Sequence, residues 1–474
     1  MAGNGNSIPR GRIRRTMPLA GFSARAAGGA MVAGLREKSG DVGAVERFHE
    51  RTAERYSDLL GHSKGVLMKA GQLLSMVDAG SIGSGGFSPY QAALARLQAD
   101  APPMDAKLAR RVLETDLGRS VGEVFAEFAD QPMAAASIGQ VHRAVLRDGR
   151  DVAVKIQYPG AAEAIRADLA NIELLATFFR FASLASTTDI QPDVLRRAAH
   201  EIAARISEEV DYRHEAANIA AFSELYRDHP FIRVPEVFSE ASGDRVLTMT
   251  YLHGMDWAAA QQADQELKNT WAEVIYRFAT GSFRHANLFH ADPHPGNYRF
   301  GQDGTVGFVD FGCVKVLPER QRRKFVGLSR AAVDGRLDDM RDLMVETGYL
   351  TADSTVTVDE CYQLMADLVY EMLEPQPVTY TRQTSERAIR AMLDLRPADH
   401  PGRRMSMPDD FVFLTRFDLC VNAVCAALGA TIHARSIWDD IDGVAEPITP
   451  LGKQHDAWVR ERGLPYGLEH HHHP

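Results

Sequence analysis

The residues best suited to chemistry lie between His290 and Gly312. Asp292 and Asn297 occur in one loop, and a short apolar run, Val306–Val309, leads from there to Asp310. An Asn carbonyl and a carboxylate are hard oxygen ligands that suit Mg²⁺, which keeps waters and phosphate oxygens as its remaining ligands. The sequence therefore predicts that Asn297 and Asp310 bind Mg²⁺ at a phosphate site, with Asp292 in the position of a catalytic base.

The order and spacing of these residues match a known phosphoryl-transfer signature. Protein kinases carry H-R-D-x-x-x-x-N followed by D-F-G, and His290, Asp292, Asn297 and Asp310 fit that pattern. The competing interpretations are a zinc cluster of His290, Asp292 and His294, and a turn beside a chance D-F-G. A zinc cluster would leave the positions of Asn297 and Asp310 unexplained, and no Cys lies nearby in the sequence as a further ligand. A chance turn does not explain why both motifs occur in order.

Two motifs further towards the N-terminus predict the nucleotide contacts. Met133–Val145 and Val152–Ile156 have strand patterns, and Lys155 matches the V-A-I-K lysine that contacts phosphates. The loop at 134–141 occupies the place of a kinase Gly-rich loop. Two of its three Gly positions are Ala, and the added methyl groups should limit its approach to phosphates. The predicted nucleotide contacts from this loop are Ala134, Ala135, Ala136, Ser137 and Gly139. The predicted contacts to adenine are Met249, Thr250 and Leu252, at the expected connection between the two lobes of a kinase-like fold.

Two more motifs place polar residues on predicted helices. Lys69, Gly71 and Gln72 form K-x-G-Q within a helical pattern at 45–76. Glu209, Asp211 and Glu215 form E-x-D-x-x-x-E within a predicted helix at 191–225, where Asp211 and Glu215 share one face. Such acids usually form a solvated face. Here one carboxylate could pair with Lys155, and others could meet a metal or the K-x-G-Q lysine.

Composition limits the function classes. The chain has 474 residues, 45% of them hydrophobic and 24% charged, and a net charge of −10, which argues against general nucleic-acid binding and suits a cytoplasmic protein. Its four Cys show no framework spacing and are expected to be reduced. No secretory signal is evident, and 411–430 predicts a buried helix. A cluster of Arg at 10–15 before the segment 17–35 suggests either peripheral membrane contact or a disordered tail.

Taken together, these motifs resemble the UbiB-type atypical kinase-like proteins, the AarF group. The resemblance covers roughly residues 40–330. It implies that the protein binds ATP, or alternatively ADP, together with Mg²⁺. It also implies a role in isoprenoid lipid or quinone metabolism at membranes, with a lipid-like or other small-molecule partner. Phosphorylation of other proteins is expected to be suppressed. The resemblance also implies that Lys155 pairs with Glu215, or with Glu173, and that Glu209 and Asp211 face Lys69 and Gln72, which with Gly71 are regulatory.

The implied architecture is an α+β, bilobal, atypical protein-kinase-like fold. We expect a flexible basic segment (1–40), a helical extension with K-x-G-Q (41–103), an N-lobe with an inserted E-x-D helix (104–250), a mostly helical C-lobe (251–467) and an expression tag (468–474). Two other functions stay open. One is a nucleotide-gated lipid-binding scaffold. The other is a small-molecule phosphotransferase, against which the K-x-G-Q and E-x-D motifs argue.

Overall fold

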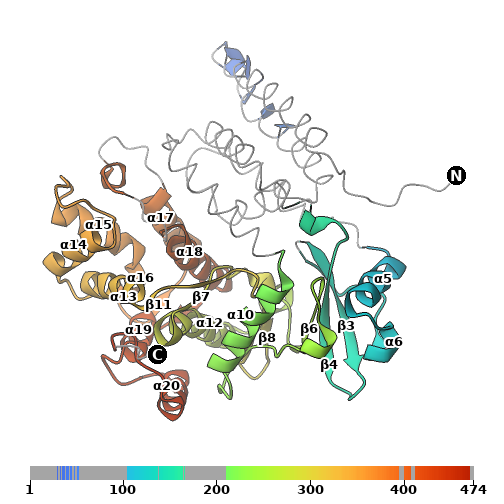
Figure 1. Ribbon diagram of the computed structural model, residues 1–474. Coiled ribbons are helices and arrows are strands. Elements are labelled where there is room, and N and C mark those ends of the chain that lie inside the picture. Colours follow the sequence, from blue (N-terminus) through green and yellow to red (C-terminus); the bar gives the residue numbers. More distant parts are fainter. Residues whose placement is uncertain are drawn as a thin grey trace. The chain divides into compact units, whose positions relative to one another are not determined.

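The computed structural model describes residues 104–165, except 137 and 164, residues 210–393, 400–406 and 411–469, and scattered residues between 29 and 52 (Figure 1). Six residues with predicted roles lie outside this part of the chain: Lys69, Gly71, Gln72, Ser137, Glu173 and Glu209. The chain divides into two compact units. The first comprises residues 1–214 and 237–251, and the second comprises 215–236 and 252–474.

The first unit is built on a five-stranded antiparallel sheet. Its strands follow the order β1-β3-β4-β6, and β2 pairs with the first residues of β3. The central strand β4 carries Val152, Val154 and Ile156, all fully buried. The elements are α5 (Ala106–Leu117), α6 (Val121–Val124), β1 (Phe125–Phe128), β2 (Ala134–Ala136), β3 (Gly139–Leu146), β4 (Asp151–Gln157), the 3-10 turn η2 (Ser239–Ala241) and β6 (Val246–Thr250).

The second unit is mostly helical. Its helices are α10 (Tyr212–Leu225, whose first residues belong to the first unit), α11 (Trp257–Ala260), α12 (Gln265–Ala286), α13 (Glu319–Val333), α14 (Leu337–Glu346), α15 (Val358–Leu368), α16 (Tyr370–Leu373), α17 (Arg382–Leu393), α18 (Phe411–Leu428), α19 (Ala434–Ile441) and α20 (Pro450–Arg462), with 3-10 turns η3 (Pro295–Asn297) and η4 (Pro401–Arg404). Its short strands are β5 (Ile232–Arg233), β7 (Leu288–His290), β8 (Tyr298–Phe300), β9 (Val306–Phe308), β10 (Val314–Val316), β11 (Val378–Thr379) and β12 (Thr431–Ile432).

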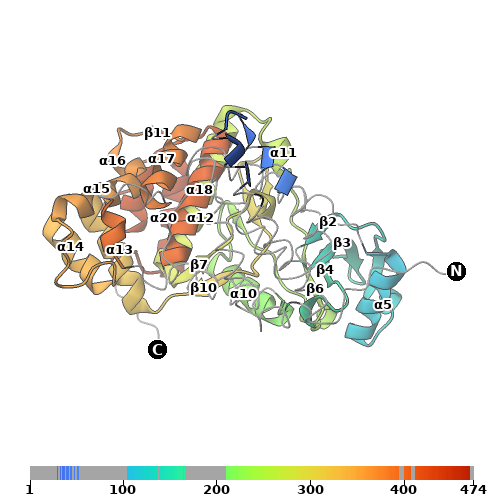
Figure 2. The same cartoon turned by 90° about the horizontal axis from the view of Figure 1, so that it is seen from above.

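Helix α12 forms the core of the second unit. Every residue from Trp271 to His285 is buried, and α18 lies beside this helix in both views (Figure 1, Figure 2). The helix ends at Asn287, which adopts a left-handed conformation at φ 58° and donates its N–H to the last turn. Because α12 leads directly into β7, its burial fixes the position at which the loop with Asp292 and Asn297, the predicted catalytic loop, begins.

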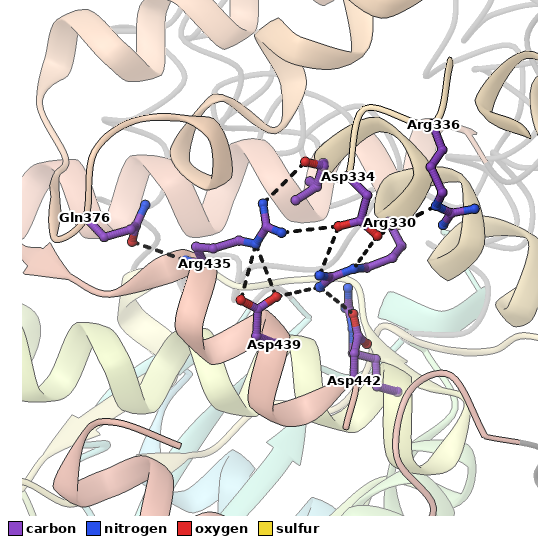
Figure 3. A network of polar contacts seen from close by, with 9 residues as sticks. Arg330, Asp334, Arg336, Gln376, Arg435, Asp439 and Asp442 are labelled. Carbon is purple, nitrogen blue, oxygen red and sulfur yellow. Dashed lines mark hydrogen bonds and ion pairs between the residues drawn. The ribbon is translucent and has the colours of Figure 1, made fainter. Parts of the chain in front are cut away.

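Ion pairs connect α12, α13 and α19. Arg330 on α13 donates to Asp439 at 2.6 Å, and Arg435 on α19 reaches back to Asp334 at 3.2 Å (Figure 3). Arg284 on α12 donates to Asp442 at 2.7 Å. Both side chains of the Arg284–Asp442 pair are buried, and buried charges need partners with good geometry.

Two differences from the sequence predictions have clear causes. The predicted strand Met133–Val145 is a hairpin of two strands, β2 and β3, which turns at Ile138. The predicted helix at 191–225 is not continuous, because Val210 and Asp211 are not helical and α10 begins at Tyr212. Asp211 therefore does not share a helical face with Glu215, and that expectation was wrong.

The predicted helix near 411–430 is present as α18, and several of its side chains, including Val421, Asn422 and Cys425, are buried. Among the helices that the structure describes, none combines the length and the apolar character needed to cross a bilayer. The described elements, a small antiparallel sheet in one unit and a helical second unit, agree with the predicted α+β class.

Candidate active site

Two antiparallel ribbons in the second unit bring the catalytic loop and the D-F-G turn together. β7 pairs with β10, so that His290 faces Val314, and β8 pairs with β9, so that Tyr298 faces Phe308. The catalytic loop connects β7 to β8, and the D-F-G turn connects β9 to β10. Both loops therefore bridge the same two ribbons and lie next to each other.

Main-chain and side-chain bonds fix the predicted metal ligands. The N–H of Val309 donates to the carbonyl of Asn297 at 3.0 Å, which places Asn297 beside the residue that precedes Asp310. The Nδ2 atom of Asn297 donates to the carbonyl of Asp292 at 3.1 Å and approaches its Oδ2 at 3.4 Å. With Nδ2 directed at Asp292, the Oδ1 of Asn297 and the Asp310 carboxylate supply the hard oxygen atoms that fit Mg²⁺.

Three hydrogen bonds hold the D-F-G turn in place. The N–H of Gly312 donates to Asp310 Oδ1 at 3.0 Å. His290 Nε2 donates to the Asp310 carbonyl at 2.6 Å, because a carbonyl can only accept. Asn218 Nδ2, from α10, donates to the Phe311 carbonyl at 2.9 Å. Burial lowers the pKa of His290 below its ordinary value and favours the neutral ring, while the bond to the Asp310 carbonyl acts in the opposite direction.

Aromatic packing supports the same turn. The ring of Phe311 is fully buried and lies 5.0 Å from Phe222 of α10 and 5.2 Å from His290, measured between ring centres. Phe222 and His290 are themselves 6.1 Å apart, edge to face. The three rings therefore form one cluster that holds α10, β7 and the D-F-G turn together.

The alternative of a zinc cluster gains no support from the described residues. His290 uses Nε2 for the Asp310 carbonyl, and His294 uses Nδ1 to accept the N–H of Gly296 at 3.0 Å. Within the part of the chain that the structure describes, no group of three or more His, Cys, Asp or Glu side chains is placed to hold a metal ion.

The predicted phosphate loop of the first unit is the β2–β3 hairpin. Ala134 pairs with Val141 and Ala136 with Gly139, with Ala135 between them opposite Gln140. A Cβ at Gly139 would lie 2.2 Å from the carbonyl oxygen of Ile156, so only Gly lets β3 approach β4 this closely. The Gly at this position therefore has a packing reason in addition to any role in phosphate binding.

Lys155 lies on the central strand of the same sheet. It pairs with Val141 on β3 and Leu247 on β6, and it is 7% exposed. Its Nζ lies 5.4 Å from the centre of the Tyr212 ring, within cation–π range. Of the residues predicted around adenine, Met249 and Thr250 are on β6, next to β4, and Leu252 begins the second unit.

Asp211 caps α10. Its Oδ1 accepts the N–H groups of Arg213 at 3.0 Å and His214 at 3.1 Å, which otherwise have no partner within the helix. Glu215 follows in the first turn and is 1% exposed. It belongs to the second unit and Lys155 to the first, so their pairing stays a prediction.

Sequence reasoning missed the contribution of Asn218 to the D-F-G turn. Asn218 lies one helical turn after Glu215 and is 9% exposed. The only signal in the sequence was that spacing, because residues three apart on a helix share a face. Its partner is 93 positions away, and no local pattern indicates that separation.

Comparisons with known proteins identify the family of the chain. Residues 96–344 match the model of the ABC1 atypical kinase-like domain. The mitochondrial atypical kinase COQ8 of Saccharomyces cerevisiae is 28% identical over 446 residues, which cover 92% of this chain and 86% of the yeast protein. The chloroplastic protein ACTIVITY OF BC1 COMPLEX KINASE 1 of Arabidopsis thaliana is 34% identical over 275 residues, which cover 56% of this chain but only 39% of the plant protein.

A solved structure gives the same architecture. It is the complex of Rv3197 with erythromycin from Mycobacterium tuberculosis, which is 32% identical in sequence with a TM-score of 0.60. The similarity covers 85% of this chain and 98% of the mycobacterial chain.

Proposed function

The chain belongs to the ABC1 atypical kinase-like family, also called the UbiB family, and from this premise we propose that it is a Mg²⁺-dependent ATPase or small-molecule kinase in isoprenoid lipid or quinone metabolism. The observation that carries the proposal is the joint placement of Asp292, Asn297 and Asp310. All three lie on two neighbouring loops, with Asn297 bonded to Asp292 and adjacent to Asp310 through Val309. Such a donor set is what phosphoryl transfer requires.

In this proposal each residue has a defined task. Asn297 and Asp310 would hold Mg²⁺, which would supply positive charge at the phosphates of ATP. Asp292 orients a hydroxyl or water and accepts its proton. Lys155 contacts the phosphates, and the β2–β3 hairpin covers them. Catalysis then rests on positioning and charge neutralisation, because phosphoryl transfer needs little covalent participation from the protein.

The segment after the D-F-G turn supports suppressed phosphorylation of other proteins. It enters β10, which pairs with β7 of the catalytic-loop ribbon, and α13 begins at Glu319. Leu317 donates its N–H to the carbonyl of Asn287 at 3.1 Å, which anchors this segment to the end of α12. A protein kinase uses a long activation segment here as its peptide platform. The short ribbon favours a small or lipid-like acceptor.

The mycobacterial relative supports a bulky small-molecule ligand, since it was solved with erythromycin, a large macrolide. We propose that this chain likewise receives a large, mainly apolar molecule, and that it contacts membranes peripherally. The same observation favours a second candidate function, a nucleotide-gated binding protein without turnover. The third is a phosphotransferase of the aminoglycoside or choline kinase type, with small alcohols as acceptors.

The test is ATP hydrolysis by the purified protein with Mg²⁺, compared between wild type, Asp310→Asn and Asp292→Asn. Anionic liposomes, a quinone-like phenol and erythromycin are added in separate arms. We expect turnover that requires both carboxylates and rises with lipid or phenol. Equal turnover in Asp310→Asn contradicts the proposal. Tight ATP binding with no hydrolysis in any arm favours the gated binding protein, and phosphate transfer to an added alcohol favours the phosphotransferase.

A further inference from the structure

We propose that Asn218 is a positioning residue that makes the metal-binding geometry of Asp310 depend on helix α10. The inference rests on the proposed function, because it concerns how Asp310 is held for Mg²⁺. It starts from the 2.9 Å hydrogen bond between Asn218 Nδ2 and the Phe311 carbonyl. Asn218 is 9% exposed, so water cannot readily replace the amide as the donor.

Two consecutive carbonyls of the D-F-G turn are held by different elements. The Asp310 carbonyl accepts from His290 of β7, and the Phe311 carbonyl accepts from Asn218 of α10. The two peptide planes share only the backbone of Phe311. If the α10 anchor is lost, the second plane can rotate, and the Asp310 carboxylate shifts with the turn. Mg²⁺ requires near-ideal octahedral ligand geometry, so a small shift at this carboxylate weakens binding.

Ring packing cannot replace this bond. Phe311 contacts Phe222 and His290, and those contacts fix where the ring lies. Packing is only weakly directional, whereas a hydrogen bond to a carbonyl sets the orientation of the peptide plane. Asn218 and Phe222 are both on α10, so the helix contributes one directional contact and one packing contact to the same turn.

A linkage between α10 and the metal follows. Asn218 and Phe222 lie on the same helix, so both contacts to the D-F-G turn move together with α10. A change that displaces α10 is then transmitted through Asn218 to Asp310. By thermodynamic reciprocity, Mg²⁺ bound at Asp310 favours the same position of α10.

The variants that test this inference remove the donor while keeping the side-chain size. Asn218→Leu retains volume without a hydrogen-bonding group, and Asn218→Asp places an acceptor against the Phe311 carbonyl. The matched control is Asn422→Leu. Asn422 is also a buried Asn of the second unit, on α18, and it donates to the Asp418 carbonyl at 3.1 Å. Asn218→His is the conservative variant, because its ring can again donate.

The first readout is amide hydrogen exchange without any ligand, over peptides that cover 306–317. We expect exchange in this segment to rise roughly fivefold to tenfold in Asn218→Leu and Asn218→Asp, the change that follows from losing one ordinary hydrogen bond. Asn218→His should recover part of the protection. Unchanged exchange in Asn218→Leu, or the same rise in Asn422→Leu, overturns the inference.

The second readout is the Mg²⁺ dependence of ADP binding, followed by calorimetry. Both Asn218 variants should need roughly fivefold to tenfold more Mg²⁺ for half-saturation, while ADP affinity in EDTA stays at the wild-type value. Equal loss in EDTA indicates general damage and overturns the inference. If wild-type protein shows no Mg²⁺-dependent nucleotide binding, the proposed function fails, and that result is separate from the exchange measurement.

Discussion

Arg277 and Asp440 form a two-pronged ion pair inside the second unit. Both Arg277 Nη atoms donate to the Asp440 carboxylate at 2.8 Å, and the two side chains are 0% and 2% exposed. Arg277 Nε also donates to Glu273 at 2.9 Å, and Glu273 accepts from Thr449 at 2.6 Å. The pair joins α12, which leads into the catalytic loop, to α19.

Removing one partner of this pair should be costly. Arg277→Met leaves the Asp440 carboxylate buried without its counter-charge, and we expect a loss of ~3–5 kcal/mol in the free energy of unfolding. The matched control is Arg382→Met, because Arg382 pairs with Glu386 at the surface and should contribute ~0–1 kcal/mol. Urea unfolding measures both. Similar losses in the two variants would contradict this account.

Three buried histidines form a hydrogen-bonded chain, and the contacts at its two ends determine which ring nitrogens carry a proton. His229 Nδ1 accepts the N–H of Ile232 at 3.0 Å, so its Nε2 donates to His455 Nδ1, also at 3.0 Å. His455 Nε2 then donates to His285 Nε2 at 3.1 Å, and His285 Nδ1 donates to the Pro465 carbonyl at 2.7 Å. Every ring is neutral in this arrangement, and an added proton would have no acceptor.

The histidine chain predicts acid sensitivity. Burial lowers the pKa of both His229 and His455 well below the ordinary value of 6.5. The unfolded chain therefore binds more protons, so stability is present above about pH 6.5 and falls as the pH drops below it. We expect His455→Gln to flatten this slope, measured by urea unfolding across the acid range. A control variant at the exposed His253 should retain the wild-type slope.

The buried carboxyl group of Glu371 predicts that stability falls as the pH rises. Burial raises the pKa of Glu371 from 4.5 to about 8, so the folded protein favours the neutral carboxyl. The resulting stability is present at low pH and is lost as the pH rises towards and through about 8. Glu371→Gln imitates the neutral form, and its melting temperature should exceed that of wild type by a margin that grows with pH. Glu374→Gln, at an exposed site nearby, should show no such growth.

Gly139 offers a direct test of the β2–β3 hairpin. Gly139→Ala forces a methyl group against the carbonyl of Ile156, and we expect a loss of ~1–3 kcal/mol in stability together with weaker nucleotide binding. The control is Gly122→Ala in α6, where no atom lies within 4 Å of the added Cβ. That change should be neutral or stabilise by up to about 1 kcal/mol. Equal effects would remove the packing reason for Gly139.

Local patterns in the sequence predicted two of the elements that carry the site. The strand at Lys155 and the D-F-G turn both depend on short-range spacing, and the structure has them as β4 and the β9–β10 connection. The order of these motifs along the chain then indicated the family. The start of α10 was missed, because an Asp at a helix N-cap looks the same in sequence as an Asp inside a helix.

Contacts between distant segments could not be read from the sequence. The histidine chain draws on positions near 229, 285 and 455, and Asn218 meets Phe311 across 93 positions. Each of these residues alone has an ordinary explanation as a buried or surface polar group. Only the fold shows that their donors and acceptors match.

Two variants of Asp211 can distinguish a structural role of this residue from a regulatory one. As the N-cap of α10 it accepts two N–H groups, so Asp211→Ala should cost ~1 kcal/mol. Asp211→Asn keeps an oxygen acceptor at the cap and should unfold like wild type. It removes the charge, however, which the predicted contact with Lys69 would need. If that contact regulates the enzyme, Asp211→Asn changes ATP turnover at unchanged stability. Wild-type turnover in this variant would leave capping as the role of Asp211 and contradict the regulatory prediction.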